Sequence, residues 1–335
     1  MMEPYPILLE PILKHRVWGG RELARLGKRL PEGEPIGESW EVADLPADIE
    51  DGRSVIANGP LAGKSLRQAI AEHGRTIMGT AGLTEEGGFP LLIKYLDARR
   101  NLSVQVHPTA EYVSRHPEAH LKSEAWVIIE ADPGAVIYKG VKPKLTAQQF
   151  AEHIRSDELV DDLVAVPVKT GDCHYLPSGT CHALGAGIIV AEIQTPSDTT
   201  FRVHDWGRSG RQLHVEQALE CIDFGLAPVE APVTVRPIEV DGLRASPLVE
   251  TEYFTIERVE ALRAVMLPVV TDDMPVIWMV IAGEGRLRGG GTEVRLAAGT
   301  TALLPAALAD GRGQLGPECT VLRVTLPAPT RGMIA

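Results

Sequence analysis

Glycine and proline interrupt this chain so often that it cannot be built mainly from long helices. The 335 residues include 33 glycines and 25 prolines, which are spread along the sequence and separate short apolar runs. Such runs between turn residues are typical of β-strands. We therefore expect a mainly β fold, with strands that include 102–106, 126–130, 135–139, 164–169, 188–194, 254–259, 276–281 and 301–304.

A few short helices should break this pattern, and the sequence predicts them at 66–78, 147–155 and 215–221. Ser65 is a suitable N-cap for the first helix. Thr146 and Gln149 have the spacing of a capping box before the second. Helices so few and irregular do not supply alternating βαβ units, which disfavours a doubly wound α/β fold.

A proline-rich stretch at 226–247 divides the chain into two parts. We interpret it as a linker between a first domain at 1–225 and a second domain at 248–335, because clustered prolines are typical of connecting segments. A chain of this length is also expected to hold about two domains.

A short internal repeat indicates that the two domains are related. Gly171 and Pro177 of the first domain recur with the same spacing as Gly299 and Pro305 of the second. Asp310 then falls where the first domain has a histidine, His182. We expect two related β-barrels, of which only the first keeps a histidine at this position.

Charge and hydropathy exclude several kinds of partner. The 45 Asp and Glu exceed the 33 Lys and Arg and give a net charge of −12, so the chain offers no basic face to nucleic acid. The longest apolar run, at 276–282, is far below the roughly 20 residues of a membrane-spanning helix. The four cysteines form no Cys-x-x-Cys pair. We expect a cytoplasmic protein with no nucleic-acid or membrane partner, and the oligomeric state stays open.

The segment GDCHYLPSGTCH carries a strong functional signal. Its Gly171, Pro177, Gly179 and His182 match the pattern G(X)5PXG(X)2H, so the segment resembles the second motif of the cupin family. In cupins this segment is a hairpin of a jelly-roll barrel, and its histidine points inward to a metal. The resemblance implies a metal site inside the first domain.

Two further pairs of polar residues have strand spacing. Gln105 and His107 are two residues apart, as are Lys122 and Glu124. Residues i and i+2 of a strand face the same side, so each pair can reach one metal ion. Two imidazoles, a carboxylate and an amide suit a divalent metal such as zinc, although the amide could instead position a water molecule.

Several longer segments point to one family. They are WGG at 18–20, GESWEVAD at 37–44, FPLLIKYLDA at 89–98, LSVQVHP at 102–108, KSEAW at 122–126, LPSGTCHALGAG at 176–187 and EIQTPSDTTFRVHDWGR at 192–208. With them the chain resembles the type I mannose-6-phosphate isomerases in their short bacterial form. The resemblance implies two cupin jelly-roll β-barrels with a few short helices. It also implies one Zn²⁺ per chain in a catalytic barrel at 1–225 and a degenerate barrel without metal at 248–335.

The resemblance also assigns roles to single residues. It implies that the zinc ligands are Gln105, His107, Glu124 and His182, and that Lys122, Glu192, Asp198 and Arg202 form the catalytic pocket. Lys94 and Ser103 are further candidates for binding the sugar phosphate. Arg202 suits a phosphate or an enediolate because its guanidinium offers paired donors, but Asp198 and Arg202 could also form a structural ion pair. The base that moves the proton between carbons 1 and 2 stays open.

Two other functions fit part of this pattern. Iron oxygenases with a cupin fold use two histidines and a carboxylate, which His107, His182 and Glu124 would also supply. A cupin could also bind a sugar phosphate without turning it over. The pocket further departs from many family members at Phe201 and His204, which bears on substrate fit.

Overall fold

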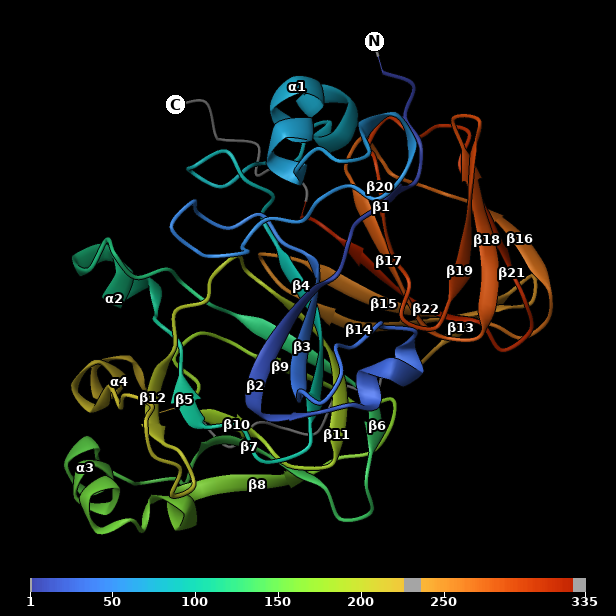
Figure 1. Cartoon of the computed structure of the whole chain (residues 1–335). Helices are drawn as coiled ribbons and strands as arrows, with labels where there is room; N and C mark the ends of the chain where they lie inside the picture. The colour runs from blue at the N-terminus through green and yellow to red at the C-terminus, as the bar shows by residue number, and fades with distance from the viewer. Residues whose placement is uncertain (1, 226–235, 328–335) are drawn as a thin grey trace.

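The computed structural model describes residues 2–225 and 236–327. They form a mainly β protein whose two halves lie side by side (Figure 1). This confirms the predicted fold class, since each half is a pair of antiparallel sheets with few helices. Among the described residues, no backbone pairing joins the two sheets of either half into a closed barrel.

The first half contains the candidate site. Its six-stranded sheet has the order β2 (Ile12–Gly20), β3 (Ile36–Val42), β4 (Leu92–Ala98), β11 (Ile188–Gln194), β6 (Glu124–Ala131) and β9 (Cys173–Leu176). The facing sheet has the order β12 (Phe201–His204), β5 (Val104–Val106), β10 (His182–Leu184), β7 (Val136–Val141) and β8 (Leu163–Pro167).

The second half repeats this strand order. One sheet runs β1 (Ile7–Leu8), β20 (Thr301–Leu304), β17 (Val276–Ala282), β22 (Thr320–Thr325), β15 (Thr255–Ala261), β14 (Leu243–Glu250) and β13 (Ile238–Val240). The other runs β16 (Val265–Pro268), β21 (Arg312–Leu315), β18 (Glu284–Gly289) and β19 (Thr292–Ala297). The series β14-β15-β22-β17-β20 therefore corresponds to β3-β4-β11-β6-β9, and β16-β21-β18-β19 corresponds to β5-β10-β7-β8.

The strand register corrects one detail of the sequence repeat. Gly313 of β21 lies opposite Leu267 of β16, just as His182 of β10 lies opposite Gln105 of β5. Asp310 precedes β21, so it does not occupy the strand position of His182, and Gly313, the first buried residue of β21, is its counterpart. The spacing of the sequence repeat predicted the wrong residue because the loop before β21 is longer than the loop before β10.

Short helices cap the ends of the sheets. α1 (Leu66–Met78), α3 (Ala147–Ser156) and α4 (Val215–Cys221) agree with the predicted helices to within one residue, whereas α2 (Ala110–Arg115) was not predicted. Thr146 and Gln149 form the predicted capping box, and Ser65 caps α1. Three short 3₁₀ helices are η1 (Glu22–Leu26), η2 (Gly59–Leu61) and η3 (Leu159–Asp162). None of the helices in the described ranges is long and apolar enough to cross a membrane.

The predicted linker differs from the structure in its second half. β13 and the start of β14 lie within 226–247 and pair as an antiparallel hairpin. Pro247 is tolerated in β14 because it sits at an irregular point of the β14–β15 pairing, where a missing N–H costs little. Residues 226–235 of the predicted linker lie outside the described residues.

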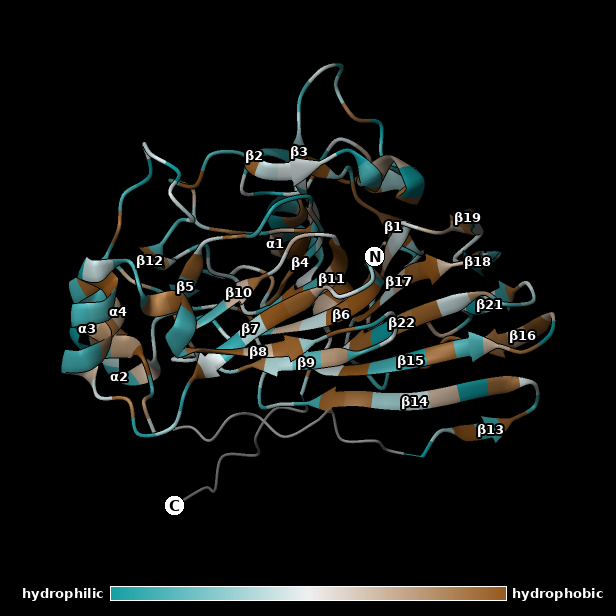
Figure 2. Cartoon of the chain, turned by 90° about the horizontal axis from the view of Figure 1, so that it is seen from below, coloured by the Kyte–Doolittle hydropathy of each residue, from teal (hydrophilic) through white to brown (hydrophobic). Residues whose placement is uncertain are grey.

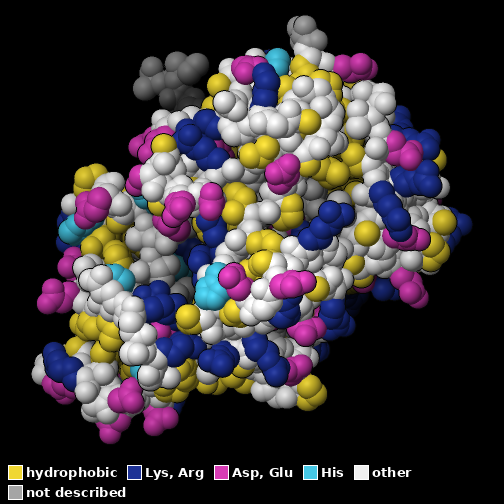
Figure 3. Space-filling view, viewed as in Figure 1, with side chains coloured by type: hydrophobic (Ala, Val, Ile, Leu, Met, Phe, Trp, Pro, Cys, Tyr) yellow, Lys and Arg dark blue, Asp and Glu magenta, His cyan; other side chains and the backbone are white. Residues whose placement is uncertain are grey.

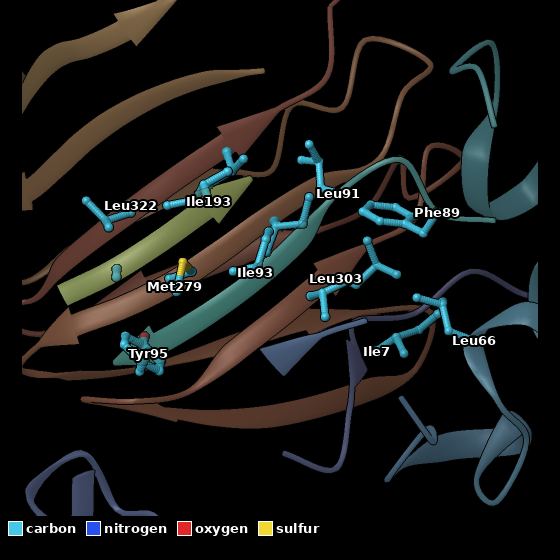
Figure 4. Packing of buried hydrophobic residues seen from close by; sticks show 14 of the residues in the cluster. Ile7, Leu66, Phe89, Leu91, Ile93, Tyr95, Ile193, Met279, Leu303 and Leu322 are labelled. Carbon is cyan, nitrogen blue, oxygen red and sulfur yellow. The ribbon is translucent and has the colours of Figure 1, made fainter. Parts of the chain in front are cut away.

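An apolar core joins the two halves. The outer face of the β4–β11–β6 sheet packs on the β17–β22–β20 sheet, and Ile93, Ile193, Met279, Leu303 and Leu322 are buried there (Figure 4). The strands that meet in this region are largely hydrophobic (Figure 2). β1 pairs with β20, so the start of the chain also belongs to the second half. The halves therefore share one core.

A buried ion pair of the first half reaches the second half through one hydrogen bond. Lys28 Nζ lies 2.7 Å from Glu41 Oε2 and also donates to the Gly299 carbonyl oxygen at 2.7 Å. Ser39 donates to the other Glu41 oxygen at 2.6 Å. Gly299 has a positive φ of 88°, and an added Cβ would lie 1.9 Å from the Leu26 carbonyl oxygen, so only glycine allows this close approach.

Lys28→Met should lower the free energy of unfolding by about 3–5 kcal/mol, because it leaves the Glu41 carboxylate buried without its partner. Urea unfolding followed by circular dichroism measures the change. Arg25→Met is the matched control, since it breaks the exposed Arg25–Glu130 pair and should have little effect. Equal losses in both variants would contradict a special role for the interface pair.

Candidate active site

Neighbouring strands bring the predicted metal ligands together. His182 begins β10 and lies opposite Gln105 of β5, which in turn lies opposite Arg202 of β12. His107 follows the last residue of β5, and Glu124 begins β6 on the facing sheet. The site thus lies between the two sheets of the first half, as the strand spacing predicted.

Three side chains converge tightly enough to hold a metal ion. One ligand atom from each of His107, Glu124 and His182 lies within 4.8 Å of the others, and all three residues are buried. The Nε2 atoms of His107 and His182 lie 3.4 and 3.3 Å from the two Glu124 oxygens. This is the only such cluster of His, Cys, Asp and Glu within residues 2–225 and 236–327.

The backbone fixes which nitrogen each imidazole offers. His107 Nδ1 lies 3.0 Å from the Thr199 carbonyl oxygen, and His182 Nδ1 lies 2.8 Å from that of Thr180. A carbonyl can only accept, so both Nδ1 atoms donate to the backbone, and the Nε2 atoms are the ring nitrogens that face Glu124. Second contacts of this kind are typical of metal-binding histidines.

The donor set fits a divalent metal ion. Glu124 is fully buried, and neither of its oxygens receives a well-oriented hydrogen bond from a described residue. Burial tends to raise the pKa of Glu124, but the charge of Lys122 outweighs it and holds the pKa well below the usual range. A buried carboxylate between two imidazoles is a typical zinc environment.

Gln105 contacts the cluster, but a hydrogen bond from Ser103 determines how its amide is oriented. Ser103 Oγ donates to Gln105 Oε1 at 3.1 Å, which leaves Gln105 Nε2 3.3 Å from His182 Nε2. In this orientation the amide offers no oxygen to a metal. A rotation of the amide would exchange its oxygen and nitrogen, so direct ligation by Gln105 stays a prediction.

Lys122 lies directly against the ligands. Its Nζ is 2.8 Å from Glu124 Oε2 and 3.0 Å from His107 Nε2. Burial and the Lys122 charge together lower the pKa of His107 to about 3. The histidine is therefore neutral at physiological pH, which is the state that binds a metal.

A large cavity opens above the cluster. Its volume is about 680 Å³, and Gln105 and Lys122, which contact the ligands, form part of its wall. Figure 3 shows that this face is recessed between the lobe of α3 and α4 and the central strands, with basic side chains at the border. The charged residues of the wall are Lys14, Arg16, Glu38, Asp48, Glu50, Lys94, Lys122, Glu192, Asp198, Arg202 and Arg211.

One wall of the cavity is a buried row of alternating charges. Lys94 Nζ lies 3.1 Å from Glu192 Oε1 and 3.7 Å from Glu38 Oε2. Trp126 donates to Glu192 at 2.8 Å, and Arg16 donates to Glu38 at 2.7 Å. Burial opposes the charge of Lys94, but the carboxylates outweigh it and raise its pKa. For Glu38 the cations likewise outweigh burial and lower the pKa to about 2.

The opposite wall holds an excess of positive charge. Asp205 is buried and accepts hydrogen bonds from both Arg208 and Arg211. Arg202 lies beside this group and donates to the Gln212 carbonyl oxygen at 2.9 Å, while its buried Nε has no partner in the part of the chain that the structure describes. Burial and the neighbouring Arg211 lower the pKa of Arg202, which shows how closely these cations crowd together.

Asp198 and Arg202 both line the cavity, as their spacing predicted. Asp198 is exposed, and the structure gives it no ion pair with Arg202 within the described ranges. The ion-pair alternative is therefore not realised here. Lys94 and Ser103 also line the cavity, but Lys94 is already paired with carboxylates.

The cavity residues that sequence reasoning missed include Arg16, Glu38, Arg211 and His214. Glu38 lies within the GESWEVAD segment, and its spacing of two from Trp40 on a strand could have placed it on the cavity side. Arg211 and His214 follow β12 in an irregular loop, where spacing predicts no orientation.

Comparisons with known proteins identify the family of this chain. The model of the family "Phosphomannose isomerase type I, catalytic domain" matches residues 7–153. Mannose-6-phosphate isomerase ManA of Bacillus subtilis is 35% identical over 327 residues, 96% of this chain and 99% of that protein. Mannose-6-phosphate isomerase of Streptococcus mutans is 34% identical over 306 residues, 90% and 92% of the two chains.

A solved structure of a relative superposes on this chain over most of its length. The crystal structure of the mannose 6-phosphate isomerase from Bacillus subtilis superposes with a TM-score of 0.84 at 31% identity, covering 95% of this chain and 99% of that one. The family model includes His107 and Glu124, and the whole-chain relatives extend the match past His182 and Arg202. The chain therefore belongs to the type I phosphomannose isomerase family.

Proposed function

We propose that this protein is a zinc-dependent aldose–ketose isomerase that interconverts mannose 6-phosphate and fructose 6-phosphate through an enediol. One observation carries the proposal: a buried His107–Glu124–His182 cluster lies beneath the same cavity that holds Arg202, whose buried Nε has no partner. The names of the relatives point to the same substrate pair.

The metal is held by His107, Glu124 and His182, with Gln105 as a fourth ligand once its amide turns. When bound, zinc polarises substrate oxygens as a Lewis acid. Lys122 adds a positive charge within 3.0 Å of two ligand atoms, so it stabilises negative charge that develops on the enediolate oxygens.

The phosphate is bound by the basic wall of the cavity. Arg202 and Arg211 face the cavity, and Asp205 neutralises only part of the charge of Arg202, Arg208 and Arg211. This local excess offsets the net charge of −12, which would otherwise repel an anionic sugar. Guanidinium groups suit phosphate because they offer paired donors.

The buried row on the other wall binds and deprotonates the sugar. Glu192 is a carboxylate on the cavity wall, and one of its oxygens lacks a well-oriented hydrogen bond from the described residues. We assign it the transfer of the proton between carbons 1 and 2. Lys94 and Glu38 hold Glu192 in place and bind hydroxyl groups, and Asp198 orients the substrate at the cavity mouth.

The purified protein should convert mannose 6-phosphate to fructose 6-phosphate in a coupled assay. A chelator should abolish turnover, and zinc should restore it, because the cluster supplies the ligands of the metal. No turnover by a folded, zinc-loaded sample would overturn the proposal. Oxygen uptake by an iron-loaded sample would favour an oxygenase instead.

His107→Ala and His182→Ala should each lose bound zinc and activity, since each removes one of the two imidazole ligands. Metal content by mass spectrometry and the same assay measure both. His73→Ala is the matched control, because His73 lies in α1, away from the cavity lining, and should keep zinc and activity. A fully active, zinc-free His182→Ala protein would refute the assigned ligand set.

Arg202→Ala should keep zinc but lower kcat/KM for mannose 6-phosphate by about 10- to 150-fold, the value of one hydrogen bond to a charged group. Arg202→Lys should recover only part of the loss, because an ammonium cannot form paired hydrogen bonds. Unchanged kinetics in Arg202→Ala would show that the arginine is structural.

A further inference from the structure

The second half keeps a counterpart of the buried row next to the metal site. In the first half, Glu192 of β11 lies opposite Lys94 of β4 and Trp126 of β6. In the second half, Arg323 of β22 lies opposite Glu257 of β15 and Trp278 of β17. The corresponding strands have the same order in both sheets.

The charges of this row are exchanged between the two halves. Glu192 pairs with Lys94 in the first, and Arg323 Nη2 lies 3.0 Å from Glu257 Oε2 in the second. The indole is kept in both rows. The row of the second half is therefore neutral as a whole, as is the Lys94–Glu192 pair.

The metal ligands have apolar or small counterparts. The register places Val276 at the position of Glu124, Leu267 at that of Gln105 and Gly313 at that of His182. An added Cβ at Gly313 would lie 2.6 Å from the Trp278 ring, so the indole occupies the space of a ligand side chain. These positions offer no side-chain atom that could bind a metal.

A cavity of about 160 Å³ remains in front of this row. Arg323, Glu257 and Trp278 form one end, and Leu267, Leu315 and Val321 form apolar walls. A second apolar hollow of about 280 Å³ adjoins it and shares Leu243, Ala245, Leu267 and Pro268. Together they form a groove that leads from the charged row to the sheet edges β13 and β16.

Two features indicate that a ligand belongs in this groove. The Arg323 Nε atom is buried, although its side chain is 39% exposed, and it has no hydrogen-bond partner among residues 2–225 and 236–327. At the other end, Ile238, Val240 and Met266 are 63%, 58% and 67% exposed, which is unusual for large apolar side chains gathered in one place. A ligand that pairs with Arg323 Nε must offer a hydrogen-bond acceptor. A ligand that covers the exposed apolar side chains must include an apolar chain.

We propose that this groove binds an aliphatic chain that ends in a neutral hydroxyl group. The hydroxyl oxygen accepts from Arg323 Nε and its proton is donated to Glu257, while the chain runs along Leu267 and Leu243 toward Met266. A neutral head fits better than an anionic one, because Glu257 already pairs with Arg323 and a carboxylate bound at Arg323 would lie beside the like charge of Glu257. This site is independent of the proposed isomerase activity.

Isothermal titration calorimetry of the whole protein with 1-octanol tests the proposal, with sodium octanoate as the second probe. We expect saturable binding of 1-octanol at one site and at least tenfold weaker binding of octanoate. Arg323→Met should weaken 1-octanol binding by about tenfold, the value of one hydrogen bond to a charged group. Arg312→Met, on an exposed position of β21, is the matched control and should bind like the wild type.

Leu267→Trp gives a second test, since a larger side chain fills the groove and should block binding. Isomerase activity of each variant shows that the protein is folded, because none of these residues lies in the active-site cavity. No binding of 1-octanol, tighter binding of octanoate, or unchanged binding in both Arg323→Met and Leu267→Trp would each overturn the proposal.

Discussion

The six-stranded sheet of the first half has one face toward the polar cavity and the other toward an apolar interface. The rest of the structure depends on how its strands separate these two faces. Alternate residues of a strand point to opposite faces. Along β3, Glu38 and Trp40 face the cavity, while Ser39 and Glu41 face the interface with the second half. One face thus holds ionised groups for chemistry, and the other is buried against an apolar partner sheet.

This arrangement gives the second half a physical role. A row of buried charges such as Lys94 and Glu192 is costly unless every group keeps its partner in good geometry. The strands that carry the row are supported from behind by the shared core and by the Lys28–Glu41 pair. The second half therefore covers the back of this sheet with apolar residues, and its positions that correspond to Glu124 and Gln105 hold the apolar Val276 and Leu267.

Much of the site could be predicted because its residues lie at strand spacing. Gln105 with His107 and Lys122 with Glu124 have the period of two, although His107 and Lys122 lie just outside β5 and β6, and the motif around His182 places that residue at the start of β10. Arg211 escaped prediction because the packing of the loop after β12 around Asp205 determines where it points. The predicted end of the linker at residue 247 was wrong for a related reason. Pro247 is typical of a loop, but it lies within β14 at an irregular point of the β14–β15 pairing, where a strand tolerates proline.

The central claim is that His107, Glu124 and His182 hold one metal ion beneath the cavity that binds the sugar phosphate. Anomalous diffraction at the zinc edge, from crystals grown with zinc, tests it most directly. The account predicts a single strong peak within bonding distance of the Nε2 atoms of both histidines and of Glu124. A peak elsewhere, or none at this cluster in crystals of active protein, would contradict it.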